Sequence, residues 1–379
     1  MSFSNKITAS IATLTPYQVG MTSAQAMRLH GLEQIHKLSS NEAPIAPSPK
    51  VCEAMAAAAI ESHLYPDYYD FKSLLAEHHG LAHNQVVLGN GSIDVIETAF
   101  RLFSDGKSNI VCSRYGYSAY ALLAKACNLD CKVAPSADSL GHDVKALASA
   151  CDENTAIVII DNPTNLAGQT LSIEQVKVLM ASVPDSVMVI IDEAYIEFTP
   201  NPNIQSAVNL VNKYDNLLVT RTFSKAYGIA GLRVGFGLAH EAIIELITRI
   251  QCPCAITNVA MAAAKAALAD AEHYQRIQQA VADGKAILYQ TFDQLGVRYL
   301  PSGGNFVVFK SPLSLASDES EESIEGKDAL KGQDLAALLL QQGYIVRPMK
   351  AFGRDDLIRV SIMEQEVMRG LAQAIERLI

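Results

Sequence analysis

Charged residues are scarce in this 379-residue sequence, and positive charge is scarcer than negative charge. Asp, Glu, Lys and Arg make up 18% of the chain, with 30 Lys and Arg against 40 Asp and Glu and a formal net charge of −10. Because an acidic protein repels polyanions, this balance disfavours a nucleic-acid-binding function. The hydrophobic content of 49% excludes a disordered chain, and the length fits one large domain plus a smaller one.

Cysteine spacing gives no sign of a metal site or a disulfide framework. The seven cysteines are scattered, and although Cys252 and Cys254 flank Pro253, no second pair and no histidine cluster completes a zinc site. The N-terminal residues contain no long apolar run, so no signal peptide is visible. Apolar stretches such as Ala156–Ile160 are too short to span a bilayer. We therefore expect a soluble, cytoplasmic protein with reduced thiols.

From about residue 85, short apolar runs alternate with helical patterns. Continuous apolar strands that alternate with helices predict an α/β domain in which helices cover both faces of a mainly parallel sheet. The expected strands are Val86–Leu88, Asn109–Cys112, Ala156–Asp161, Val187–Asp192, Leu217–Arg221 and Arg233–Leu238. The expected helices include Ile93–Phe103, Tyr117–Ala126 and Ser172–Ser182, the last with a Ser-x-x-Gln capping box.

The pattern changes after about residue 255. A long Ala-rich helix over Asn258–Leu295, weakly interrupted at Gly284, is followed by β-like pieces and a final helix, which predicts a second, α+β domain. The β-like pieces are Asn305–Phe309, Ile345–Pro348 and Leu357–Ile362. We expect an N-terminal arm over 1–40 that joins the small domain, a large domain over 41–255 and a small domain over 256–379. Residues 311–332, which are polar and acidic, are expected to form a flexible surface insertion.

One lysine lies in surroundings that suit covalent chemistry. Lys225 follows a predicted buried strand, with Ser224 beside it and Arg233 eight residues later. A partly desolvated amine loses its proton more easily and can form a Schiff base, whereas serine and arginine side chains can both bind a phosphate. Alone, a Ser-Lys pair after a strand is more simply a solvated surface feature.

Neighbouring strand ends supply chemical partners for Lys225. Asp192 ends an apolar run, at the edge where open parallel sheets bind ligands, and could keep a pyridine nitrogen protonated. Tyr195 and Asn165 could both donate to the phenolic oxygen of the same ring. The simpler interpretations are a helix cap for Asp192 and a turn for Asn165.

Two further stretches suit a phosphorylated aromatic ligand. The Gly-rich turn Leu88–Asp94 leads from a strand into a helix, where backbone N–H groups at Gly91, Ser92 and Ile93 could cradle a phosphate. Tyr115 follows another strand and could lie flat against a pyridine ring. Core packing is the alternative for at least one of the three tyrosines in this aromatic stretch.

In this order and spacing, Asn165, Asp192, Tyr195, Lys225 and Arg233 resemble the motifs of the fold-type I, pyridoxal 5′-phosphate (PLP)-dependent aminotransferases of class I/II. Within that group the chain resembles the histidinol-phosphate aminotransferase branch, and the resemblance covers nearly the whole chain. Further matching motifs stand at 14–17, 37–42, 47–50, 65–67, 89–92, 346–349 and 357–359. The fold implied is a large domain with a mainly parallel seven-stranded sheet between helices, plus a smaller α+β domain.

The resemblance also implies a role for individual residues. Lys225 would hold the cofactor as an internal aldimine and move the proton between substrate Cα and cofactor C4′, while Asp192 and Tyr195 would assist catalysis. The implied PLP ligands are Gly91, Ser92, Ile93, Tyr115, Asn165, Asp192, Tyr195, Ser224, Lys225 and Arg233, with Tyr65 contributed by the second subunit of a homodimer. The implied substrate ligands are Tyr17, Asn41, Arg347 and Arg359, of which Arg359 would receive a carboxylate. No metal is implied.

Three turns depart from the family pattern. Leu166-Ala-Gly168 stands where Pro-Thr-Gly is common, Ile93 replaces an acid in the phosphate turn, and Met363 makes the turn after Arg359 bulkier. The bulkier turn at Met363 lies beside the expected substrate ligand Arg359, so it affects which substrate is expected more than which reaction.

The implied reaction is a ping-pong transfer of an amino group from histidinol phosphate to 2-oxoglutarate, a step of histidine biosynthesis. Three alternatives stay open at this point. The chain could be an aromatic or other amino-acid aminotransferase, or a PLP-dependent decarboxylase of a phosphorylated amino acid. A PLP-binding regulator would need a DNA-binding module ahead of the matching region, and the acidic charge opposes it.

Overall fold

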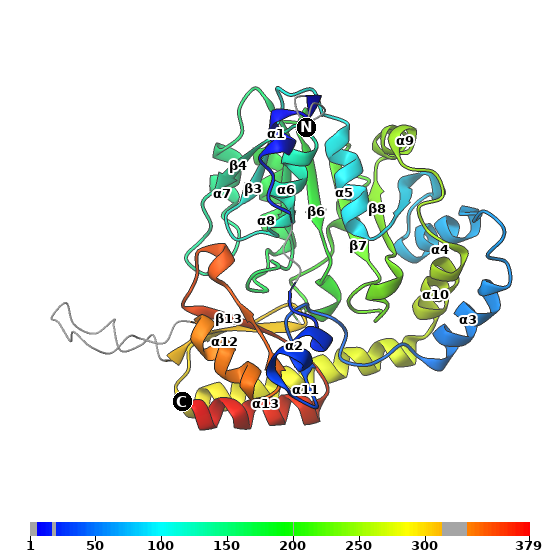
Figure 1. The fold of residues 1–379 in the computed structure, drawn as a ribbon. Helices are drawn as coiled ribbons and strands as arrows, with labels where there is room; N and C mark the ends of the chain where they lie inside the picture. Colours follow the sequence, from blue (N-terminus) through cyan, green and yellow to red (C-terminus); the bar gives the residue numbers. More distant parts are fainter. Residues whose placement is uncertain (1–5, 17–19, 200, 313–331) are drawn as a thin grey trace.

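The computed structural model of the chain describes residues 6–16, 20–199, 201–312 and 332–379 (Figure 1). Its central element is a seven-stranded sheet in the order β2-β8-β7-β6-β5-β3-β4, in which β8 alone runs antiparallel to its neighbours. The strands are β2 (Val86–Gly89), β3 (Asn109–Ser113), β4 (Asp130–Ala134), β5 (Thr155–Asp161), β6 (Met188–Asp192), β7 (Leu217–Thr222) and β8 (Gly235–Ala239). The predicted mainly parallel, seven-stranded α/β sheet is confirmed.

Helices cover both faces of this sheet because its central strands are apolar on both sides. In β5, for example, Ile157 and Ile159 pack on one face, whereas Val158 and Ile160 pack on the other. The first face is covered by α5 (Ser92–Arg101), α6 (Ala119–Ala126) and α9 (Glu241–Ile250). The second is covered by α3 (Pro49–Ala59), α4 (Tyr69–His79), α7 (Val144–Ser149), α8 (Ile173–Ser182) and α10 (Asn258–Ala269). The capping box predicted at Ser172 is present.

The edge strand β4 was not predicted. Only Ala134 of this strand is buried, and the sequence Asp130-Cys-Lys-Val-Ala134 lacks the apolar run that marks the central strands. As an edge strand it pairs only with β3, so one side of its backbone needs no partner strand.

The long Ala-rich helix is two helices, α10 and α11 (Ala271–Leu295), and they separate at Asp270 rather than at Gly284. The prediction of an interruption at Gly284 was wrong. This glycine lies inside α11, where a Cβ atom would come 2.3 Å from the Cγ2 atom of Ile362. It therefore allows a close approach between helix and neighbouring strand instead of ending the helix. Because α10 packs with the large sheet, the block expected from residue 256 begins structurally with α11.

The C-terminal block is a four-stranded antiparallel sheet, β12-β13-β10-β9, packed against α11 and two further helices. Its strands are β9 (Tyr299–Leu300), β10 (Phe306–Lys310), β12 (Arg347–Pro348) and β13 (Leu357–Ser361), and its helices are α12 (Gly332–Gln341) and α13 (Gln365–Leu378). In the N-terminal arm, β1 (His36–Lys37) pairs in parallel with β11 (Tyr344–Ile345), so the arm contacts this block. Most of the expected insertion at 311–332 lies outside the described residues.

The remaining elements are short. They are α1 (Ala9–Ala12), α2 (Ser23–His30) and the 3₁₀ helices η2 (His83–Gln85), η3 (Ile196–Phe198), η4 (Ala207–Leu210), η5 (Ala230–Leu232) and η7 (Lys350–Phe352). In the part of the chain that the structure describes, no helix has the length and apolar character needed to span a bilayer.

Candidate active site

A cavity of about 320 Å³ lies where the carboxyl ends of β5, β6 and β7 face the N-terminal arm and the C-terminal sheet. Open parallel sheets bind ligands at this edge. The lining residues come from segments distant in sequence: Gly20, Ser39, Ser40, Asn41, Glu42, Ser92, Ile93, Tyr117, Ser118, Asp161, Asn165, Asp192, Ala194, Tyr195, Thr222, Ser224, Lys225, Ala230, Arg233, Arg347, Phe352 and Arg359.

Lys225 extends into this cavity three residues after β7 ends. Its Nζ atom donates to the carbonyl oxygens of Ser40 (3.3 Å) and Asn41 (2.9 Å), and it lies 5.5 Å from the centre of the Tyr195 ring. Burial, and then the nearby guanidinium of Arg359, lower the pKa of Lys225 to about 8. The neutral, nucleophilic amine is therefore accessible near physiological pH.

Asp192 ends β6 and is almost fully buried. Its Oδ1 atom accepts from the Thr220 hydroxyl (2.9 Å) and its Oδ2 atom from the Tyr120 hydroxyl (3.0 Å). Burial raises the pKa of Asp192 to about 7, although both hydrogen bonds oppose the shift. Such a carboxylate favours a ligand that brings a positively charged N–H group, because that charge offsets the cost of burial.

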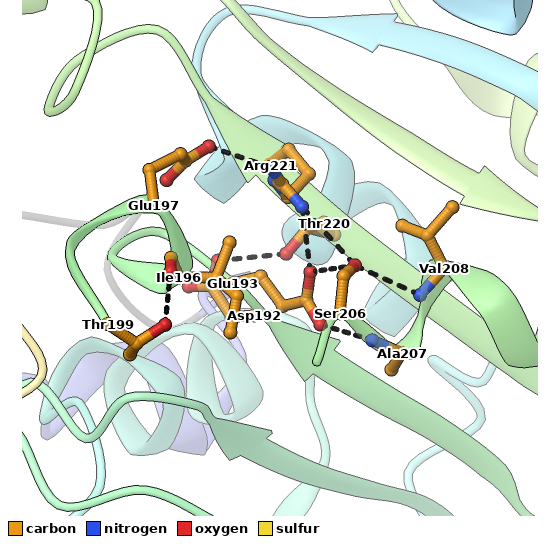
Figure 2. Close-up of polar contacts among 10 residues, drawn as sticks. All are labelled: Asp192, Glu193, Ile196, Glu197, Thr199, Ser206, Ala207, Val208, Thr220 and Arg221. Carbon is orange, nitrogen blue, oxygen red and sulfur yellow. Dashed lines mark hydrogen bonds and ion pairs between the residues drawn. The ribbon is translucent and has the colours of Figure 1, made fainter. Parts of the chain in front are cut away.

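On the opposite face of the same strands, a buried ion-pair network fixes the ends of β6 and β7 (Figure 2). Arg221 donates to Glu193 (2.9 Å) and to Glu197 (2.8 Å), and Glu193 also accepts from the Ser206 hydroxyl and the Ala207 N–H. Because side chains alternate along a strand, Asp192 faces the cavity while Glu193 faces this network.

Tyr195 connects the two sides of the cavity. Its hydroxyl oxygen accepts from the amide groups of Asn165 (2.9 Å) and Asn41 (3.2 Å). Arg359 on β13 donates to the backbone oxygen (2.7 Å) and the side-chain oxygen (3.1 Å) of Asn165. Arg347 stands directly opposite Arg359 in the β12–β13 pairing, so two cationic side chains border the cavity at the C-terminal sheet.

The corner where α5 begins brings together groups that bind phosphate. The helix starts at Ser92 after Gly91, whose φ of 82° suits glycine, and its first N–H groups have no acceptor within the helix. Arg233 donates to the Ser224 hydroxyl (3.1 Å), which brings the guanidinium to the same corner. A Cβ atom on Gly91 would come 2.3 Å from Nη2 of Arg233, so glycine is needed for this approach.

Most of the predicted site residues meet in the cavity: Asn41, Ser92, Ile93, Asn165, Asp192, Tyr195, Ser224, Lys225, Arg233, Arg347 and Arg359. Gly91 directly precedes Ser92. Tyr65 does not join them within one chain, because its side chain is 90% exposed on the loop between α3 and α4. Tyr17 lies outside the described residues.

Tyr115, predicted to lie flat on a ligand ring, packs against a hydrophobic cluster that includes the cavity residue Tyr195, and the Arg114 guanidinium lies 5.5 Å from its ring centre. Tyr117 is among the residues that line the cavity, whereas Tyr115 is not. The stacking of Tyr115 on a ligand ring stays a prediction.

Other residues of the site were missed at the sequence level. Tyr120 is fully buried and holds Asp192, whereas Ser39 and Ser40 line the cavity from the N-terminal arm. Asp161 ends β5 as Asp192 ends β6, so its place after an apolar run was a signal that could have identified it.

A family model described as aminotransferase class I and II matches residues 33–375. The chain belongs to this family. A histidinol-phosphate aminotransferase of Nitrosococcus oceani is 34% identical to it over 98% of this chain and 96% of that protein. One from Ralstonia nicotianae is 37% identical over 93% of this chain and 91% of that protein.

Solved structures of the family have the same fold. The histidinol-phosphate aminotransferase of Sinorhizobium meliloti, in complex with pyridoxal 5′-phosphate, superposes with a TM-score of 0.84 at 26% identity, over 99% of this chain and 98% of that chain. An aspartate aminotransferase of Thermus thermophilus gives a TM-score of 0.82 at 17% identity, over 98% of each chain, and supports the fold alone. The predictions of fold-type I architecture, aminotransferase activity and PLP as cofactor are confirmed.

The residues present fit that cofactor. An amine with a lowered pKa, a buried acid, two hydrogen-bonding groups and a cationic, Gly-lined corner converge on one cavity. These are the groups needed for an aldehyde, a pyridine nitrogen, a phenolic oxygen and a phosphate.

Gly235 on β8 provides a test of the phosphate corner. In Gly235→Ala, the new Cβ atom would lie 2.1 Å from the backbone nitrogen of Ser92, so the first turn of α5 must move. We expect the free energy of unfolding to fall by about 1–3 kcal/mol and PLP affinity to fall roughly tenfold or more, because the N–H groups are displaced. Urea unfolding and a fluorescence titration with PLP measure both effects.

Gly231→Ala is the matched control, since a Cβ atom there meets nothing within 4 Å. Equal PLP affinity in the two variants would contradict a phosphate site at the start of α5.

Proposed function

We propose that the chain transfers the amino group of histidinol phosphate to 2-oxoglutarate by a ping-pong mechanism. The observation that carries this proposal is the nearly full-length similarity, at 34–37% identity, to histidinol-phosphate aminotransferases of Nitrosococcus oceani, Nitrosospira multiformis and Ralstonia nicotianae. The arginine pair at the cavity supports it, because both substrates carry an anionic group that needs a cationic partner.

When bound, PLP supplies an electron-deficient ring that accepts the electron pair left on the substrate's Cα. Lys225 would hold the cofactor covalently and, once released, would take the proton from the substrate's Cα and deliver it to the cofactor carbon C4′. Asp192 would keep the pyridine nitrogen protonated, with its carboxylate held by Thr220 and Tyr120. Asn165 and Tyr195 would bind the phenolic oxygen.

The remaining residues bind the anionic groups. Ser92, Ile93, Ser224 and Arg233, which border the cavity at the start of α5, would hold the cofactor phosphate. Arg359 binds the carboxylate of glutamate or 2-oxoglutarate. Arg347 and Asn41 would complete the substrate pocket, and the two facing arginines would let one pocket accept a carboxylate in one half-reaction and a phosphate in the other. Tyr17, which lies outside the described residues, stays a predicted substrate ligand.

We also propose a homodimer in which Tyr65 reaches the cofactor phosphate of the second subunit. The support is an exposed apolar group on the loop between α3 and α4, where Ile60 is 81%, Leu64 56% and Tyr65 90% exposed. Apolar side chains gathered on a surface mark interfaces. All seven cysteines are free thiols, which supports a reducing compartment, the cytoplasm, as the site of action.

The pKa of Lys225 predicts how its reaction with PLP depends on pH. Because only the neutral amine attacks the aldehyde, the rate should rise roughly tenfold per pH unit below pH 8 and level off above it. Mixing cofactor-free protein with PLP at several pH values and following visible absorbance measures this rate.

In Lys225→Ala the absorbance change should be absent. Lys285→Met is the control, since Lys285 is also buried with a pKa lowered to about 8 but lies outside the cavity. An unchanged reaction in Lys225→Ala would assign the covalent bond to another lysine.

A panel of amino donors tests the substrate. Histidinol phosphate, glutamate, phenylalanine and phosphothreonine are each added to the PLP-loaded protein, and conversion to the pyridoxamine form is followed by absorbance. We expect histidinol phosphate and glutamate to convert the cofactor fastest, with Arg359→Gln slowing glutamate at least tenfold through loss of a charge-assisted pair. Fast conversion by phenylalanine and none by histidinol phosphate would favour an aromatic aminotransferase, and CO₂ release from phosphothreonine would favour a decarboxylase.

Mixed dimers test the role of Tyr65. Tyr65→Ala and Lys225→Ala subunits should each be poorly active alone. After unfolding and refolding together, half of the dimers are hybrids, and each hybrid has one site with both residues intact, so activity should recover to about a quarter of the wild-type value. Recovery no greater than the sum of the separate variants would mean that Tyr65 serves its own subunit or no site.

A further inference from the structure

A second acid borders the cofactor cavity beside Asp192. Asp161 ends β5, pairs in register with Asp192 on β6, and is 2% exposed. Its Oδ2 atom accepts the backbone N–H of Asn165, whereas no hydrogen bond to its Oδ1 atom is found among the described residues. Two acids at the ends of adjacent strands therefore border one cavity, and one carboxylate oxygen of Asp161 is left without a donor.

His142 holds Asp161 from the loop that follows β4. Its Nε2 atom lies 2.7 Å from the backbone oxygen of Asp161 and 3.5 Å from Oδ1, and the ring is 7% exposed. Because a carbonyl oxygen can only accept, Nε2 carries the proton and points toward Asp161. The loop is itself fixed by a bridge between His142 and Ser136.

Gly116 leaves room above this pair. A Cβ atom on Gly116 would come 3.1 Å from Oδ1 of Asp161 and 4.0 Å from Cε1 of His142. A larger residue there would press on Oδ1, the buried oxygen of the Asp161 carboxylate.

The described contacts do not explain why the carboxylate is kept in this position. A buried carboxylate with an unused oxygen costs free energy, and a structural role is better served by a neutral side chain. The cost falls when a positively charged or proton-donating ligand occupies the cavity. Both oxygens of Asp192 already accept a hydrogen bond, whereas Oδ1 of Asp161 is buried next to Gly116 and His142 without one in the described part of the chain, so a cationic group in the cavity would act on Asp161 through its charge.

We propose that Asp161 is a second acid of the cofactor site, which stabilises the protonated forms of the bound cofactor, and that His142 is its positioning residue. This inference rests on the proposed PLP-dependent function. The other titratable groups that interact electrostatically with Asp161 are Cys112 on β3, Tyr120 on α6, Asp192 on β6 and Tyr195 after it.

The proposal predicts the pH at which the bound cofactor changes colour. A negative charge nearby favours the proton on the nitrogen that joins Lys225 to PLP, so removing that charge lets the proton leave at lower pH. In Asp161→Asn we expect the midpoint of the visible absorbance change to fall by about one pH unit, and PLP affinity to fall roughly tenfold. Asp185→Asn, an exposed surface position, is the control for the same change of side chain.

His142 variants separate positioning from packing. His142→Ala should shift the midpoint in the same direction as Asp161→Asn but by less. His142→Gln retains an N–H donor that can reach the Asp161 carbonyl oxygen, so it should restore most of the wild-type midpoint. In the Asp161→Asn background, His142→Ala should have no further effect, because the carboxylate it positions is gone.

If PLP-loaded Asp161→Asn has the same absorbance midpoint as the wild type, the proposal is wrong. It is also wrong if His142→Ala shifts the midpoint by the same amount in the wild-type and the Asp161→Asn backgrounds. Circular dichroism shows whether Asp161→Asn folds. If it does not, the absorbance midpoints of His142→Ala and His142→Gln test the proposal instead, and identical midpoints in these two variants reject the positioning role. Failure of the proposed function has a different signature, since the wild-type protein itself would then show no PLP absorbance or no amino transfer.

Discussion

The site depends on the parallel pairing of β5, β6 and β7, which brings the ends of three buried strands to one edge of the sheet. Asp161 pairs in register with Asp192, and Asp192 with Thr220. Burying two carboxylates side by side costs free energy. Hydrogen bonds from the Thr220 and Tyr120 hydroxyls and from the Asn165 N–H offset part of that cost. The ion pairs of Arg221 with Glu193 and Glu197 fix the same strand ends from the opposite face. Every role assigned around the cofactor requires this register, because a slip of one residue would turn Asp192 away from the cavity.

The charge distribution explains how an acidic protein can present a cationic cavity to anionic groups. The chain has a net charge of −10, yet the cavity collects Lys225, Arg233, Arg347 and Arg359. Within a few ångströms, buried charges dominate over distant surface charges that water and salt screen. The acids Asp161 and Asp192 stand at the strand ends, whereas Arg347 and Arg359 stand on the C-terminal sheet, so the cavity has oppositely charged sides. A cofactor with a cationic ring and substrates with anionic groups suit this polarity.

Much of the fold and the centre of the site could be predicted from the sequence, because they depend on local patterns. Central strands such as β5 and β6 are continuous apolar runs, and Lys225, Asp192 and Asn165 follow such runs directly. Features set by tertiary packing could not be predicted. Tyr120 holds Asp192 across 72 positions of sequence, and His142 reaches Asp161 only because the loop after β4 folds back. Turn geometry after β3, not residue type, decides which tyrosine of that stretch lines the cavity, and Tyr117 does so.

The contact at Gly284 has a mechanical consequence. The backbone of α11 lies against Ile362, three residues after Arg359, with no space for even a methyl group between them. A larger residue at position 284 would therefore have to displace Ile362, which directly follows β13. The close approach at this glycine thus ties the placement of α11 to the strand whose guanidinium, that of Arg359, reaches Asn165.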